Sequence, residues 1–376
     1  MKAVKKNVKF DYFLLTAVLA LVALGVVMVY SSSFYNMIVK HNSPQKMLYE
    51  GLKFAGAGTI GMFVMSLFNY KKLFKLVPFL YITAITLSGA VLIFGKRIYG
   101  AKRWIDLGVM NGTIMPSEIA KIAIIFTFAG LVSLAGDRIK GLRQYSLMLG
   151  LLSALCLLTA VQPDFSTAAL MFTLGLIMLF IARVNMMHLL STTGILMLAG
   201  VGYVSIAEYR IKRVLIWWHN LKDTTYVFED ARRQITYSVY ALSSGGMNGA
   251  GLGMSELKNL RLPEPYNDFI FAIIGEELGF IGSVLVLLLF TFVIFRVFSI
   301  AFHCKDIFGF MIAAGTGVLI SLQVVINVGV VLNLLPTTGI PLPFVSKGGT
   351  SLIILMMLMG VVLNISLQNK LHEVSS

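Results

Sequence analysis

The stretch DYFLLTAVLALVALGVVMVY, from Asp11 to Tyr30, decides the fold class of this chain. It contains a single charged residue at its start, and its length matches the roughly 20 apolar residues that a helix needs to cross a bilayer. Four lysines precede it, at positions 2, 5, 6 and 9. This arrangement resembles a signal peptide, but the apolar run is too long for one. We therefore predict a retained first transmembrane helix.

Similar apolar stretches recur along the 376 residues, separated by polar breaks. Hydrophobic residues make up 57% of the chain and the mean hydropathy is +0.85, which excludes an ordinary soluble domain. Backbone groups in lipid must bond to one another, so these stretches must be helices. The sequence predicts an all-α, polytopic integral membrane protein: one domain over residues 1–376, about ten transmembrane helices, and a large external loop at about 208–267 between helices 7 and 8. The expected spans lie near 11–31, 49–68, 74–95, 115–135, 145–162, 164–183, 187–207, 268–297, 307–333 and 349–369.

The net charge of +14 comes from basic residues in the polar breaks. Membrane orientation and anionic lipids account for this charge, so no nucleic-acid partner is expected. Lysines before the first span, and basic residues near 71–75 and 138–143, favour a cytoplasmic location for both termini. The reversed orientation stays open, because the favoured one leaves many basic residues outside. These are Lys96, Arg97, Lys102, Arg103, Arg210, Lys212, Arg213, Arg232 and Arg233.

Ionisable residues within the expected spans are few, and in lipid such residues are costly and usually functional. Glu118 and Lys121 lie three residues apart, so they share a helix face and can neutralise one another. A structural pair at a helix start opened by Pro116 is an equally good interpretation. Asp164 follows a Gln-Pro pair where one span ends and the next begins. It is either a functional carboxylate or a residue that favours the positive end of its helix.

The segment LPEPYNDFIF, residues 262–271, ends the long loop and enters the eighth span. Asp268 then lies at the boundary of water and lipid, where it could accept a proton from a lipid-anchored substrate. The alternative is an ordinary aspartate at a helix start. Glu276 and Glu277 follow about 12 Å deeper along the same helix. At that depth they must be hydrogen-bonded or protonated.

The segment LPTTGIPLPF, residues 335–344, runs into SKGGT at 346–350 and cannot be continuous helix. Proline removes hydrogen-bond donors, and glycine permits unusual backbone angles. Irregular backbone at membrane depth is tolerated where it lines a cavity or is buried in protein. The segment is therefore expected to line a substrate groove or to form a plain connecting loop.

Taken in order, several short motifs between the spans resemble the SEDS family, named for shape, elongation, division and sporulation. The resemblance covers nearly the whole chain, and the order of the motifs makes it specific. Within the family, GLGMS at 251–255 is more similar to FtsW and SpoVE than to RodA. Lys347, Asn267 and Arg233 depart from the usual pattern. The motifs are VYSSS at 29–33, RWI at 103–105, PSEIAK at 116–121, QPD at 162–164, YRIKR at 209–213, SGG at 244–246, GLG at 251–253, LPE at 262–264, DFIFA at 268–272 and GEE at 275–277.

The resemblance implies a peptidoglycan glycosyltransferase of the bacterial cytoplasmic membrane, active in division, elongation or sporulation. It would polymerise lipid II at the outer face beside a class B penicillin-binding protein. Asp268, the acid of the Pro-Glu-x-x-x-Asp segment, would be the base of an inverting transfer. The leaving pyrophosphate needs positive charge. No metal-ligand cluster is visible, so no cofactor is certain, and a divalent cation, Mg²⁺ or Mn²⁺, stays open. The expected substrate-binding residues are Lys102, Arg103, Glu118, Lys121, Asp164, Arg210, Lys212, Arg213 and Glu264.

Two other functions stay open at this stage. A transporter that flips lipid-linked precursor would also use Glu118, Lys121 and Asp164 as a polar path through the membrane. A scaffold that only recruits a transpeptidase would tolerate replacement of Asp268. The two alternatives differ from the enzyme in whether the purified protein makes glycan from lipid II.

Overall fold

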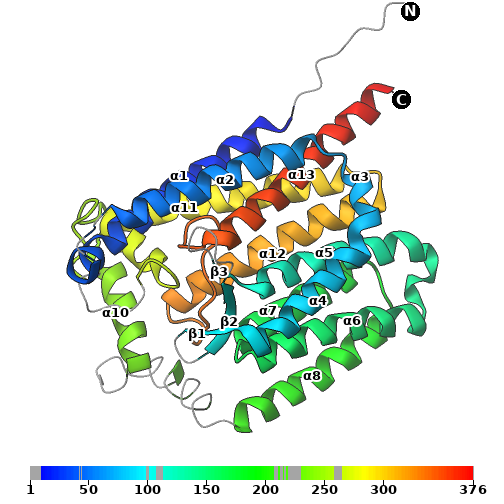
Figure 1. Ribbon diagram of the computed structural model, residues 1–376, viewed down its shortest axis with the longest axis horizontal. Helices are drawn as coiled ribbons and strands as arrows, with labels where there is room; N and C mark the ends of the chain where they lie inside the picture. The colour runs from blue at the N-terminus through cyan, green and yellow to red at the C-terminus, as the bar shows by residue number, and fades with distance from the viewer. Residues whose placement is uncertain are drawn as a thin grey trace, which may run out of the picture.

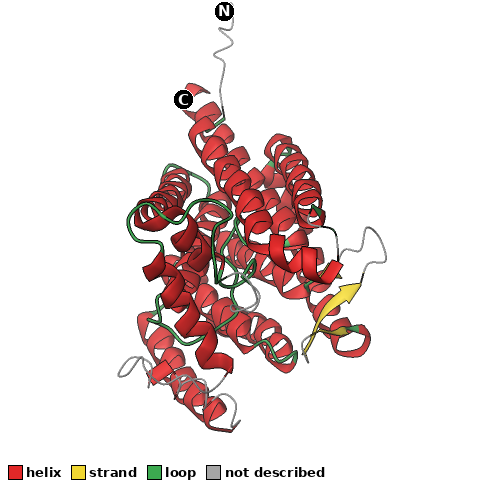
Figure 2. Cartoon of the chain, turned by 90° about the vertical axis from the view of Figure 1, so that its left-hand side faces the viewer, coloured by secondary structure: helices red, strands yellow, loops and turns green. Residues whose placement is uncertain are grey.

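The computed structural model describes residues 10–41, 43, 45–98, 101–106, 113–206, 211, 215, 217–218, 230–257 and 265–375. Over these residues the chain is a bundle of long helices with one small sheet (Figures 1 and 2). The start of α1 and the end of α13 lie at the same end of the bundle (Figure 1). In chain order the helices are α1 (Tyr12–His41), α2 (Lys46–Leu67), α3 (Tyr70–Leu73), η1 (Phe74–Leu76), α4 (Val77–Phe94), α5 (Pro116–Ala135), η2 (Gly136–Lys140), α6 (Leu142–Val161), α7 (Phe165–Ile181), α8 (Met186–Ile206), α10 (Asp230–Ser244), α11 (Ile270–Phe302), α12 (Ile307–Val331) and α13 (Gly349–Ser375).

Seven helical stretches within the described residues are long and apolar enough to cross a membrane. The prediction of a polytopic helical membrane protein is confirmed, whereas the count of about ten spans is not. Helices α2 and α8 occupy expected span positions but do not belong to the seven, and α7 is a shorter apolar helix. In α2 the charges of Lys46, Glu50 and Lys53 lower the hydropathy. The seven stretches are Tyr12–Tyr35, Tyr70–Phe94, Pro116–Lys140, Leu142–Val161, Ile270–Phe302, Ile307–Val331 and Gly349–Asn369.

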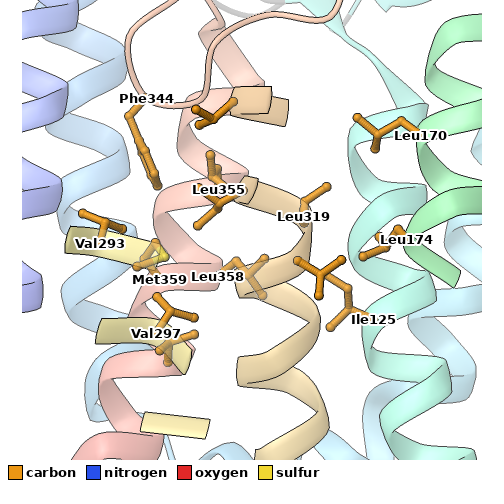
Figure 3. Close-up of a cluster of buried hydrophobic side chains, with 14 of the residues drawn as sticks. Ile125, Leu170, Leu174, Val293, Val297, Leu319, Phe344, Leu355, Leu358 and Met359 are labelled. Carbon is orange, nitrogen blue, oxygen red and sulfur yellow. The ribbon is translucent and has the colours of Figure 1, made fainter. Parts of the chain in front are cut away.

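Helix α12 runs through the middle of the bundle and packs against α5, α7, α11 and α13. Figure 3 shows the contact layer, in which Leu319 of α12 lies between Ile125 of α5 and Leu355 of α13. All three side chains are buried or nearly so. Lipid tails are as apolar as these side chains, so van der Waals packing rather than release of water holds the helices together.

Glycines allow α2 and α13 to approach closely. A Cβ atom at Gly360 of α13 would lie 2.3 Å from the backbone oxygen of Met62 in α2. A Cβ at Gly58 of α2 would lie 2.5 Å from Sδ of Met356 in α13. Small residues at such an interface let two backbones touch, which is a common packing mode of membrane helices.

The connection from α4 to α5 contains the one departure from an all-α fold among the described residues. It forms an antiparallel sheet in the order β1 (Lys96–Ile98), β2 (Ala101–Asp106) and β3 (Thr113–Ile114). Lys96 pairs with Trp104, and Ile105 pairs with Ile114. Figure 2 shows the sheet at the edge of the helical bundle. The prediction of an all-α protein is therefore wrong in this small segment, because alternating residues of the connection pair as strands.

The described part of the predicted 208–267 loop is not simply a loop. It contains α10, and residues 245–251 pack against a break in α11. The break is at Gly279, where φ is 69° and ψ is −170°. The backbone N–H groups of Ala250 and Phe280 donate to the carbonyls of Glu276 and Gly246, at 2.9 and 2.8 Å. The continuous span expected over 268–297 is thus interrupted, and the loop satisfies backbone groups that the break frees.

The segment between α12 and α13 is irregular, as predicted. Asn333, Gly339 and Phe344 have positive φ angles of 60°, 74° and 64°. Ile340, Leu342 and Phe344 are nevertheless buried. Irregular backbone is therefore placed inside the protein rather than against lipid, where unpaired polar groups would be costly.

Candidate active site

Asp268 lies two residues before the start of α11, and its side chain is half-buried. The N-cap residue of α11 is Phe269, and no side chain caps this helix end. Asp268 is therefore not itself the N-cap residue of α11. Its carboxylate faces the irregular segment after α12, because a Cβ atom at Gly339 would lie 3.3 Å from Asp268 Oδ2.

The residues around Asp268 are held by two elements that sequence reasoning did not connect with it. Asn327 of α12 donates from Nδ2 to the carbonyl oxygen of Asp268 at 2.9 Å. Ser346 donates from Oγ to the carbonyl oxygen of Asn267 at 2.7 Å. An asparagine inside a span without charged residues is the signal that could have identified Asn327, because such a residue is costly in lipid.

Glu118 and Lys121 form the predicted ion pair on α5. Their closest Nζ–Oε2 distance is 2.8 Å, and the side chains are 12% and 4% exposed. Pro116 occupies the first turn of the helix, as the sequence indicated. The expectation that these residues neutralise one another is confirmed, and a buried pair of this kind avoids the cost of an isolated charge.

The Glu118–Lys121 pair lines a small cleft between α5, α12, α13 and the segment 341–346. Gln323 of α12 also lines the cleft and is 5% exposed. Its Oε1 has no hydrogen-bond partner among the described residues. Ser346 belongs to the wall of the cleft and also bonds to the residue before Asp268. Ser346 therefore joins the cleft to the loop that carries Asp268, which supports the groove interpretation of the segment.

Asp164 lies at the start of a helix, as the sequence indicated, and it also contacts a cation. It is the N-cap of α7, where Oδ1 accepts from the N–H of Thr167 at 3.5 Å. Oδ1 also lies 3.7 Å from Nη1 of Arg103. Burial raises the pKa of the Asp164 carboxyl above its usual value, while Arg103, the Thr167 bonds and Lys121 act in the opposite direction. Ionised Asp164 therefore depends on these partners.

Together these side chains form a row of alternating charge. Arg103 also donates to the carbonyl oxygen of Pro163. Lys121 is close enough to favour the charged form of Asp164 and is itself bonded to Glu118. The structure thus brings four of the predicted substrate-binding residues into one region, although the sequence places them as far as 61 residues apart, from 103 to 164.

Lys102 does not join this row. Successive residues of a strand point to opposite faces, and Nζ of Lys102 lies 3.4 Å from the carbonyl oxygen of Leu92 in the last turn of α4. A cation at the C-terminal end of a helix is favoured by the helix dipole. Lys102 and Arg103 therefore do not converge on one anion in this structure.

The remaining predicted site residues are Arg210, Lys212, Arg213 and Glu264, and they lie outside the described residues. Within the described residues, no three histidine, cysteine, aspartate or glutamate side chains are grouped as a metal site would require.

Glu276 and Glu277 have the hydrogen-bond partners that their depth required. Glu276 accepts from the hydroxyl of Ser255 and from the N–H of Glu256, the latter at 2.8 Å. Glu277 accepts from the hydroxyl of Ser31 at 2.7 Å. These carboxylates anchor the loop after α10, and helix α1, to the first part of α11.

Comparison with known proteins gives consistent matches over nearly the whole chain. The family model described as "Cell cycle protein", for FtsW, RodA and SpoVE, matches residues 12–371. Stage V sporulation protein E of Bacillus subtilis is 37% identical over 369 residues, covering 96% of this chain and 98% of that protein. The probable peptidoglycan glycosyltransferase FtsW of Trichlorobacter lovleyi is 36% identical over 370 residues, covering 96% and 94%.

Solved structures give the same result for the fold. A peptidoglycan synthase complex, studied for the coordination of polymerization and crosslinking, contains a chain with a TM-score of 0.78 and 26% identity. The match covers 96% of this chain and 98% of that one. RodA, the rod shape determining protein of Thermus thermophilus, has a TM-score of 0.68 and 25% identity, covering 95% and 96%. From the motifs, the fold and these matches, the chain belongs to the SEDS family of FtsW, RodA and SpoVE cell-cycle proteins.

Proposed function

We infer that this chain is a peptidoglycan glycosyltransferase that polymerises lipid II. Relatives that are 36% and 32% identical over most of the chain are named as probable peptidoglycan glycosyltransferases. The observation that carries the catalytic assignment is the position of Asp268. Its carboxylate sits half-buried before α11, against the segment that also borders the Glu118–Lys121 cleft. A general base must be held in this way, within reach of a bound substrate.

The proposed reaction is an inverting glycosyl transfer. Asp268 removes the proton from the 4-hydroxyl of the acceptor sugar, and this oxygen forms a bond to the anomeric carbon of the donor. The bond from that carbon to the lipid pyrophosphate breaks, and the pyrophosphate leaves with the electron pair. One carboxylate base is sufficient, whereas glycoside hydrolases use a pair.

Cations are proposed to stabilise the leaving pyrophosphate. Among the described residues, Arg103 is a candidate to contact the pyrophosphate. It lies beside Asp164 and is linked through it to Lys121, which lines the cleft. Arg210, Lys212 and Arg213 are further candidates from the sequence. A divalent cation, Mg²⁺ or Mn²⁺, would serve the same purpose.

We place the protein in the bacterial cytoplasmic membrane with both termini in the cytoplasm. Lysines before α1 favour this orientation. The common end of the bundle at which α1 starts and α13 ends agrees with it. Asp268 would then lie toward the outer face.

A class B penicillin-binding protein is the proposed partner. The solved complex with the higher TM-score couples polymerization with crosslinking, and crosslinking is the reaction of a transpeptidase. The role in division, elongation or sporulation follows the family, whose matched members include a sporulation protein and FtsW proteins.

The second candidate function is a flippase for lipid-linked precursor. The row of Arg103, Asp164, Lys121 and Glu118, in which Asp164 and Lys121 are buried, favours it, because such residues also suit a polar translocation path. Purified protein in liposomes supplied with lipid II on one side separates the two. Glycan product, detected by gel analysis, supports the polymerase. Lipid II that changes leaflet without any polymer contradicts it.

A further inference from the structure

Three consecutive carbonyl oxygens lead into Asp268, and each accepts a hydrogen bond from a part of the chain beyond α11. The oxygen of Tyr266 accepts from the backbone N–H of Lys347 at 2.9 Å. The next two accept from Ser346 and Asn327, as described above. The backbone that carries the proposed base is therefore bonded at every residue over this short stretch.

Asn327 connects the two sides of the site with one amide group. Its Nδ2 donates to Asp268 O and to Ile340 O, at 2.9 Å in both cases, and the side chain is 1% exposed. Both contacts are carbonyl oxygens, so only the NH₂ end of the amide can face them. Ile340 follows Gly339, which the Asp268 carboxylate faces. The amide thus sets the distance between the base and the wall opposite it.

Ser346 holds the residue before Asp268 in the same way. Its hydroxyl accepts from the N–H of Leu342 at 2.8 Å and donates to the oxygen of Asn267. Ser346 is 7% exposed, so water does not easily replace either bond. The bond from Leu342 closes a turn over residues 342–346. The bond to Asn267 connects this turn to the loop that carries Asp268.

We propose that Asn327 and Ser346 are positioning residues that hold Asp268 in register with the Glu118–Lys121 cleft. This proposal rests on the proposed function, in which Asp268 is the base. Neither residue is required to touch the reacting atoms. A base that is displaced by about 1 Å loses up to about 100-fold in rate, because proton transfer depends steeply on geometry.

The test compares kcat and KM for lipid II polymerisation by purified variants. Ser346→Ala removes the hydroxyl, and Ser346→Thr restores it. Asn327→Leu removes the donor at nearly constant volume. Ser321→Ala is the matched control, because this hydroxyl lies on the same helix as Asn327 and, among the described residues, bonds to Gly317 O alone. We expect kcat to fall about 10- to 100-fold in Ser346→Ala and in Asn327→Leu, with little change in KM.

Rescue by Ser346→Thr and native kinetics of Ser321→Ala complete the expected pattern. Thermal denaturation curves in detergent show whether each variant is folded at the assay temperature. If folded Ser346→Ala and Asn327→Leu keep the native kcat, the positioning role is wrong. Asp268→Asn tested in parallel separates the two failures, because an active Asp268→Asn protein contradicts the proposed base itself.

A second observation lies at the other end of the bundle, where α5 passes through η2 into α6. A cleft there is lined mostly by apolar side chains and by two polar ones. The lining residues are Leu131, Leu134, Ala135, Ile139, Leu147 and Met148, together with Arg138 and Gln144. Leu134 and Leu147 are 72% and 52% exposed, and both lie on helices apolar enough to span a membrane. With these helices in a membrane, the apolar opening would face lipid rather than water.

The rim of this cleft is positively charged. Residues 136–143 contain Arg138, Lys140 and Arg143 against a single acid, Asp137. Arg138 is exposed and forms no ion pair within the described part of the chain. We infer that the cleft binds one acyl chain of an anionic phospholipid, whose phosphate contacts Arg138. A free phosphate would have no use for the apolar lining, so the bilayer is the source of the ligand.

Spin-labelled phosphatidylglycerol in phosphatidylcholine vesicles tests this site by the motionally restricted fraction in its spectrum. Arg138→Gln is expected to lower that fraction, and Lys305→Gln, an exposed cation between α11 and α12, is the control. Ala135→Trp, which fills the cleft, should lower it as well. Equal fractions in all variants contradict the site. Complete displacement of the lipid by inorganic phosphate contradicts the role of the apolar lining.

Discussion

A catalytic and a purely structural role of Asp268 predict different results for one substitution. Asp268→Asn should abolish polymerisation, because asparagine keeps the shape of the side chain but cannot take the proton. General-base catalysis contributes about 10²- to 10⁴-fold, so a loss of at least that size is expected in glycan synthesis from lipid II. Two measurements serve as controls for folding. They are co-purification of the penicillin-binding partner and the thermal midpoint of the variant. Near-native synthesis by a folded variant would remove Asp268 as the base and return Glu264 or Asp164 to consideration.

Arg103 is the second residue with a clear test. Arg103→Ala should impair the use of lipid II more than it harms folding, because a cation near the interface would hold the pyrophosphate. The first effect is measured as a higher KM for lipid II, and the second as a lower thermal midpoint. Arg210→Ala is expected to act in the same way. Arg103 also sits beside buried Asp164, so Asp164→Asn in the Arg103→Ala background tests whether an unpaired carboxylate causes part of the loss. Native polymerisation by both single variants would assign these charges to phospholipid contacts or topology.

At the scale of an element, the break in α11 depends on Gly279. A Cβ atom there would lie 2.2 Å from the backbone nitrogen of Gly249, and the φ angle of 69° disfavours any other residue. Gly279→Ala should therefore lower the thermal midpoint in detergent, since a strained backbone of this kind costs on the order of 1–3 kcal/mol before the clash is counted. Gly150→Ala in α6 is the matched control, because no neighbouring atom lies within 4 Å of the position that its methyl group would take. An unchanged midpoint in Gly279→Ala would show that α11 can straighten.

For the whole molecule, the testable property is orientation. In a protein with Cys156 and Cys304 replaced by serine, a single cysteine at position 220 should react with an impermeant maleimide in intact cells, because the proposed orientation places the loop that precedes Asp268 outside. A cysteine at position 305, between α11 and α12, should react only after the membrane is opened, since a spanning α11 separates the two positions. The reverse labelling pattern would overturn both the topology and the access of Asp268 to an external substrate.

The sequence by itself determined the features that depend on neighbours along the chain. Apolar length predicted where the spanning helices lie, and the three-residue spacing of Glu118 and Lys121 predicted their contact. The position of Asp164 after Gln162-Pro163 predicted that it lies at a helix start. Proline and glycine at 336–349 predicted an irregular segment. Each of these follows from local geometry, which is the same in any helical membrane protein.

Only the tertiary structure decided the contacts between residues far apart in the chain. The pairing of Arg103 with Asp164, the amide of Asn327 between Asp268 and Ile340, and the loop packed on the Gly279 break all depend on helix packing. Hydropathy cannot predict them, because lipid and protein interior are equally apolar and the pattern does not say which helix faces which. The site is therefore assembled by packing that buries polar groups together, since each would be costly alone in lipid.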